Sequence, residues 1–74
     1  MTLAITVHPA GQGWAISTPD LAGEIYFISG GKAEAAARAL ARRLARAGRS
    51  VELEIVLRDG SIAARAVYPR AHLA

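Results

Sequence analysis

Three side chains near the amino terminus, those of His8, Ser17 and Asp20, are the types that form hydrolytic triads. The nucleophilic serine of many such enzymes lies in a Gly-x-Ser-x-Gly elbow, a strained turn that exposes its hydroxyl. The segment WAISTPD around Ser17 has no elbow of this kind. We therefore expect no enzymatic activity and interpret His8 as an exposed residue at the end of a strand.

The sequence offers little to a metal or a cofactor. It has no Cys, and its two histidines, His8 and His72, do not have the spacing of metal ligands. We expect neither a metal nor a cofactor.

Positive charge is the remaining chemical feature, because 9 Lys and Arg stand against 6 Asp and Glu, a net charge of +3. The segment SGGK, which ends at Lys32, could bind an anion at a helix start, but the full phosphate-loop spacing is absent and a helix cap is favoured. Four arginines share the predicted outer face of that helix: Arg38, Arg42, Arg46 and Arg49. Such a row could contact phosphates or an acidic protein. No aromatic residues interleave with it, and an Arg- and Ala-rich composition is typical of GC-rich genomes, so a solvated basic face is favoured.

These residues must be positioned by strands and one helix. Apolar and polar residues alternate from Leu3 to Val7, the period of a strand with one buried face. Residues 9–12 break the run, and a four-residue loop there would place Val7 opposite Trp14, so that the apolar faces of two strands coincide. We expect Trp14 and Phe27 on the core faces.

The segment of residues 24–28 is aromatic and β-branched on both faces, as in a strand buried on two sides or held at a subunit contact. A chain of 74 residues also has a marginal core, which favours oligomerisation. We therefore expect a homodimer whose contact residues are Ile25, Tyr26, Phe27 and Ile28. The pair Gly30 and Gly31 could serve as a hinge for the exchange of elements between subunits.

From residue 32 to about residue 47 the pattern is helical. One stripe at the helical period contains Ala33, Ala36, Ala37, Leu40, Leu44 and Ala47. Its small side chains predict a helix that lies close against a sheet, and Gly48 is expected just after the helix end.

Residues 51–57 and 62–68 are expected to form a second hairpin, joined by a two-residue type I′ turn at Asp59 and Gly60. That turn pairs Leu57 with Ile62, Ile55 with Ala64, Leu53 with Ala66, Val51 with Tyr68 and, on the opposite face, Glu54 with Arg65.

The element order is thus β-β-β-α-β-β, an α+β fold with one helix on one face of a mostly antiparallel sheet. We expect a single domain over residues 1–69 and a flexible tail over residues 70–74. The first residues resemble neither a signal peptide nor a membrane span, so a cytoplasmic location and no membrane partner are expected.

Several short motifs follow one another along the chain: His8-Pro9, Gly13-Trp14-Ala15-Ile16, Lys32-Ala-Glu-Ala35, Leu44-Ala45, Asp59-Gly60-Ser-Ile62 and Tyr68. In this order they resemble a family of small uncharacterised bacterial domains, over about residues 7–69. The segment TPDLAGEIYF is longer and more apolar than in that family. The resemblance implies a fold and a bacterial origin, and it implies no activity.

A second resemblance covers Gly13 to about Leu44. The stretch GWAISTPDLAG and the glycine-led helix after it are similar to the amino-terminal domain of HicB-type antitoxins. Ala22 stands where those proteins have a second proline, and their acidic helix start is here Lys32-Ala-Glu34. Pro19 and Asp20 are sufficient to form the turn without a toxin partner, because Pro fixes φ and Asp can bond to its own turn.

Together these patterns favour a non-enzymatic interaction module whose partner is a second copy of the chain. The alternative is a nucleic-acid-binding or HicB-like regulator that uses the arginine face and Lys32. The two classes differ in whether the outer face of the helix carries the function.

Overall fold

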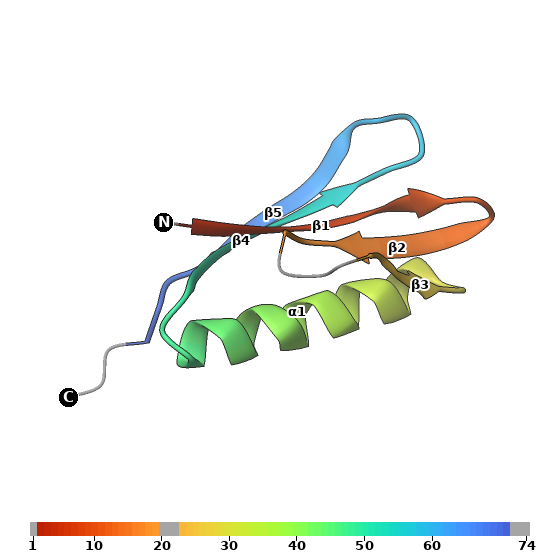
Figure 1. Ribbon diagram of the computed structural model, residues 1–74. Coiled ribbons are helices and arrows are strands. Elements are labelled where there is room, and N and C mark those ends of the chain that lie inside the picture. Colours follow the sequence, from red (N-terminus) through yellow and green to blue (C-terminus); the bar gives the residue numbers. More distant parts are fainter. Residues whose placement is uncertain (1, 20–22, 72–74) are drawn as a thin grey trace.

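The computed structural model describes residues 2–19 and 23–71 and contains one helix and five strands in that part of the chain (Figure 1). The elements are β1 (Thr2–Ala10), β2 (Gly13–Ser17), β3 (Ile25–Phe27), α1 (Gly30–Arg46), β4 (Ser50–Val56) and β5 (Ile62–Tyr68). The strands form one sheet in the order β3-β2-β1-β4-β5, and α1 lies along one face of it. The predicted α+β fold and its element order are therefore confirmed.

The centre of the sheet is a parallel pair, β1 beside β4, while the other neighbouring strands are antiparallel. Alternate residues of these two strands face α1 and form most of the core: Leu3, Ile5, Val7, Val51, Leu53 and Ile55. The opposite face of the sheet has no helix over it in the described part of the chain. The strands therefore follow the alternation that the sequence shows, with one face buried.

The β1–β2 hairpin is tighter than the sequence predicted. Its loop is two residues long, Gly11 and Gln12, and Val7 pairs with Ile16 instead of Trp14. Gly11 has φ +58°, and a glycine with positive φ at the first loop position is what a type II′ turn uses. The predicted register was wrong by two residues, which leaves the same side chains on the buried face because the strand period is two.

The β4–β5 hairpin has the predicted register over most of its length. Val51 with Tyr68, Leu53 with Ala66, Glu54 with Arg65 and Ile55 with Ala64 are all paired as predicted. The predicted pair at the turn is wrong: Ile62 pairs with Val56, because the register shifts by one residue next to Ile55.

The turn itself is a three-residue loop, not the predicted two-residue type I′ turn. The Gly60 N–H donates to the Leu57 carbonyl at 2.9 Å, and the Leu57 N–H donates to the Ser61 carbonyl at 2.8 Å. Gly60 alone has positive φ (+89°), and the Asp59 carboxylate accepts from the Ser61 N–H. This is the common loop in which a type I turn is followed by one left-handed glycine.

Helix α1 begins after Ser29, whose hydroxyl oxygen accepts from the Lys32 N–H at 3.1 Å. It ends in a Schellman motif: the Gly48 N–H donates to the Ala45 carbonyl and the Arg49 N–H to the Leu44 carbonyl. Gly48 has φ +96°, as its predicted position requires. At 17 residues with many charges, this helix, the one present in residues 2–19 and 23–71, is too short and too polar to cross a bilayer.

The buried stripe of α1 is rotated from the predicted one. Ala33, Ala37, Ala41 and Ala45 are buried, and Ala36, Leu40 and Leu44 pack at their side. Ala47, predicted to lie in the stripe, is exposed because it is the C-cap residue, where the helix has already ended. A stripe of alanines lets the helix axis approach the sheet closely.

The chain after β5 runs back to the helix end. Pro69 ends the strand, and the Ala71 N–H donates to the Ala45 carbonyl at 2.9 Å. The predicted tail was residues 70–74, of which residues 72–74 lie outside the described part of the chain.

Candidate functional site

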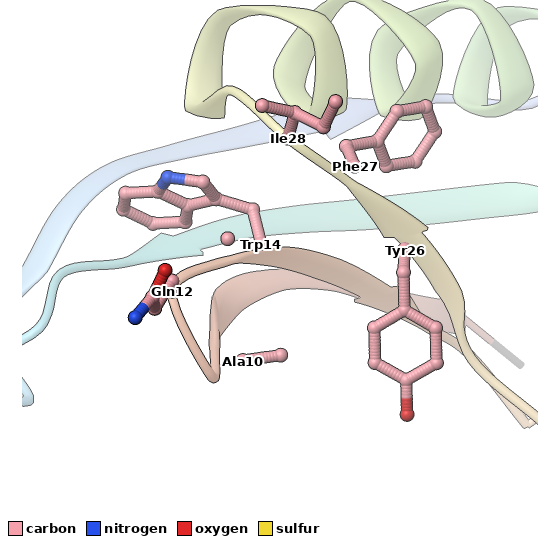
Figure 2. Close-up of a pocket in the computed structure, with 7 residues that line it drawn as sticks. Ala10, Gln12, Trp14, Tyr26, Phe27 and Ile28 are labelled. Atoms are coloured by element: carbon pink, nitrogen blue, oxygen red, sulfur yellow. The ribbon is translucent and has the colours of Figure 1, made fainter.

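A hollow with three aromatic residues in its lining lies where β2 begins and β3 ends (Figure 2). Its volume is about 440 Å³. Ala10, Gln12 and Gly13 of the first hairpin form one wall, and Trp14, Tyr26, Phe27 and Ile28 form the other. Figure 2 shows Phe27 directed toward the helix and Tyr26 directed to the other side of the sheet. The hollow therefore wraps around the end of an edge strand.

Strand β3 is this edge strand, and it contains most of the predicted dimer contact. Ile25, Tyr26 and Ile28 are 44%, 68% and 92% exposed, while Phe27 is half-buried and packs against the core. The strand pairs only with β2 in the described structure, so its outer backbone groups have no strand partner there. The structure thus brings the four predicted contact residues to one free edge, with Phe27 turned inward as predicted.

Glycine at position 13 allows β3 to lie against β2. A Cβ atom at Gly13 would collide with the backbone carbonyl of Phe27, which cannot move aside as a flexible side chain can. At Gly30 the nearest atoms to a Cβ atom would be those of the Trp14 ring, at 3.0 Å. The site therefore depends on a small residue where the two strands approach.

Arg58 holds the wall of the hollow in place. Its guanidinium donates to the carbonyl oxygens of Gly11, Gln12 and Gly13 at 3.0–3.1 Å. Its Cζ also lies 5.4 Å from the centre of the Trp14 ring, within the range of a cation–π contact. Sequence reasoning missed this residue, because the contact requires that β1 and β4 are neighbours and that both hairpin loops lie at one end of the sheet.

His8 forms a second contact between strands, on the face of the sheet away from the helix. Its Nε2 lies 2.6 Å from Glu24 Oε2, and its Nδ1 lies 3.0 Å from the Pro9 carbonyl oxygen. The Tyr26 hydroxyl donates to the other Glu24 oxygen at 3.3 Å. Between them Ala15 is completely buried, and its small side chain leaves room for Glu24 to reach across β2.

Both nitrogens of the His8 ring face acceptors, which favours the doubly protonated ring. The Pro9 carbonyl raises the pKa of His8 most, and the Glu24 carboxylate raises it further against the opposing effect of burial. Neither nitrogen is left to act as a base toward Ser17. Asp20, the third member of the triad considered from sequence, lies outside the described residues.

The raised pKa of His8 gives a pH dependence with a definite sign. The protonated ring stabilises the fold fully below the ordinary pKa of 6.5, and this stabilisation is lost as the pH rises through the raised value. In an NMR titration the His8 ring is expected to titrate above pH 6.5, and Glu24→Gln is expected to lower that midpoint. Part of the shift should persist in Glu24→Gln because the Pro9 carbonyl remains. An unchanged midpoint in this variant would contradict the contact.

The predicted basic residues are not held together as one row. Lys32 is exposed at the helix start, where the Ser29 hydroxyl caps its N–H. Arg38 is half-buried and donates to Glu34 at 2.9 Å and to the Tyr68 hydroxyl at 3.2 Å. Arg42 and Arg46 line a groove beside β5, and Arg49 lies beyond the helix end. Only Arg42 and Arg46 therefore share a surface feature.

Among the described residues no group of three or more His, Asp or Glu side chains is arranged to hold a metal ion. Comparison of the chain with models of protein families, with curated proteins and with solved structures finds no match. The two resemblances noted in the sequence stay predictions.

Proposed function

We propose that this chain is a bacterial, cytoplasmic interaction module without enzymatic activity, and that it acts as a homodimer joined through β3. The observation that carries the proposal is the free edge of β3, where Ile25, Tyr26 and Ile28 are exposed beside the aromatic hollow. An edge strand with apolar side chains is a template for pairing with another strand. Natural proteins place charges on such edges when they must stay unpaired, and residues 25–28 carry none.

A second copy of the chain suits this edge because a two-fold axis lets the same strand serve both subunits. Pairing of β3 with its copy would join two five-stranded sheets and cover Ile28 from solvent. The net charge of +3 does not favour an acidic partner at this edge. The ionisable side chains beside it already have partners, because His8 and Tyr26 both bond to the Glu24 carboxylate.

Ile28→Lys tests the proposal. The native chain is expected to sediment as a dimer at micromolar concentration, and the variant as a monomer, because a lysine at the edge must be desolvated for the strands to pair. Analytical ultracentrifugation over a concentration series measures the dissociation constant of the dimer. This constant should rise at least tenfold, which corresponds to a loss of about 1.4 kcal/mol of binding free energy. The side chain is 92% exposed, so the variant is expected to fold normally.

Val67→Lys is the matched control, because Val67 is also exposed (65%) but lies on β5, the other edge of the sheet. It should leave the dimer intact. A native chain that remains monomeric at high micromolar concentration would refute the proposal. If Val67→Lys dissociated the dimer and Ile28→Lys did not, the contact would lie at β5 and the proposal would be wrong.

A further inference from the structure

A second groove lies between the carboxyl-terminal half of α1 and the end of β5, far from β3 in the strand order. Its volume is about 320 Å³, at the lower end of the range of ligand pockets, roughly 300–1,000 Å³. The floor is apolar and contains Ala45, Val67, Tyr68, Pro69 and Ala71. The bond from the Ala71 N–H to the Ala45 carbonyl holds the far wall against the helix. The groove is thus formed by ordered contacts of the fold.

The rim of this groove is positive. Arg42 and Arg46 lie one helical turn apart and both line it. Within residues 2–19 and 23–71 neither arginine forms an ion pair. The Arg46 Nε–H donates to the Arg42 carbonyl, and this is the one hydrogen bond of the two side chains in that part of the chain. Other arginines of the chain are committed: Arg38 to Glu34, Arg65 to Glu54, and Arg58 to the first hairpin loop. Two cations therefore flank an apolar floor without a counter-charge in the described structure.

The third component is the backbone of β5. This strand is the other edge of the sheet, so its outer N–H and carbonyl groups have no strand partner in the described residues. Val67 belongs to this strand and lines the groove, and its neighbour Tyr68 packs against the core on the helix side. An extended segment that paired with β5 would place alternate side chains beside the groove.

We propose that this groove binds an extended acidic peptide segment of another protein. Its main chain adds to the edge of β5, one apolar side chain occupies the floor, and flanking carboxylates bond to Arg42 and Arg46. A nucleic acid fits less well, because a phosphate backbone would use the two arginines and leave the apolar floor empty, and because Arg38 is already bonded to Glu34 and Tyr68.

The probe is the peptide Glu-Leu-Glu-Val-Glu-amide with fluorescein joined to its amino terminus, titrated by fluorescence anisotropy, with amide shifts mapped by NMR. It is expected to bind and to shift the amides of Val67 and Ala71. The double variant Arg42→Gln with Arg46→Gln should weaken binding by about tenfold, which corresponds to about 1.4 kcal/mol. The same peptide with Gln in place of Glu should bind as weakly to the native chain.

The control is the double variant Lys32→Gln with Arg43→Gln. It also removes two positive charges, but from exposed positions of α1 outside the groove. It should leave binding of the peptide unchanged. Equal losses in the two double variants would show that only net charge matters and would overturn the proposal, as would no binding at about 1 mM peptide, a limit of about −4.1 kcal/mol.

Duplex DNA in the same assay separates the two classes of partner. Non-specific binding to DNA is expected to be no tighter than about 10⁻⁴ to 10⁻⁶ M at physiological salt. A sub-micromolar DNA complex that the variant of Arg42 and Arg46 abolishes would assign these arginines to nucleic acid instead. Because the groove and β3 lie at opposite edges of the sheet, either proposal can fail without the other.

Discussion

Leu53→Ala is expected to destabilise the fold by about 2–5 kcal/mol, the usual cost of removing a fully buried leucine side chain. Leu53 is 1% exposed and lies at the centre of the sheet, between its strand neighbours Ile5 and Ala66 and beneath the helix. A chain of 74 residues has a total stability of only roughly 4–11 kcal/mol at ~0.05–0.15 kcal/mol per residue. This one substitution should therefore remove a large part of it, as measured by urea unfolding.

Leu57→Ala is the matched control in the same part of the chain. Leu57 is 40% exposed and begins the second hairpin loop, where its bonds to Gly60 and Ser61 are made by the backbone and survive the substitution. Its loss should cost less than about 1 kcal/mol. Similar unfolding midpoints for the two variants would show that the Leu53 side chain is not buried in the core as the structure places it.

The second large effect is expected for Gly13→Ala. The added methyl group would collide with the Phe27 backbone carbonyl, so β3 must move away from β2 or the first hairpin must distort. Overpacking of this kind typically costs about 1–3 kcal/mol. Amide exchange should show the loss concentrated at residues 25–27, and the proposed dimer should weaken in parallel because β3 is its contact strand.

Gly31→Ala provides the comparison. A Cβ atom at Gly31 meets nothing within 4 Å, and in the first turn of α1 alanine is the better helix former. This variant should be as stable as the native chain or slightly more stable. If Gly13→Ala were equally harmless, β3 would not be held against β2 as closely as the structure shows.

The second hairpin was the part of the fold that local sequence predicted best. Apolar and charged residues alternate over residues 51–55 and 64–66, so a slip by one residue would expose a buried face, and four of the five predicted pairs are confirmed. The error at Leu57 arose because Asp-Gly fits both a two-residue and a three-residue loop. Only the hydrogen bonds of Gly60 and Ser61 distinguish them.

The contacts between distant strands could not be predicted in the same way. Neither the pairing of β1 with β4 nor the bonds of Arg58 to the first loop leaves a local pattern, since each joins segments more than forty positions apart. The contact of His8 with Glu24 leaves no local pattern either. These two residues meet because β2, with its small Ala15, lies between their segments.

At the candidate site, the apolar composition of residues 25–28 was a better guide to surface position than the helical spacing of the arginines. The run IYFI was predicted to be a contact strand because it is apolar on both faces, and the structure places it at an edge with three exposed side chains. The contact itself stays a prediction. The arginine row was predicted from helical spacing alone. Spacing could not show that Arg38 would bond to Tyr68, thirty positions later, and so leave the row.

The parallel pair at the centre of the sheet also determines the order in which the chain can fold while it is being synthesised. Residues of β1 pair with residues 48 positions later, as Thr2 does with Ser50 and Val7 with Ile55. When α1 has left the ribosome, β1, β2 and β3 are already complete, but the edge of β1 that pairs with β4 still has no partner strand. Folding therefore cannot finish until β4 emerges, and through that interval the nascent chain presents an open, apolar strand edge to other chains and to chaperones.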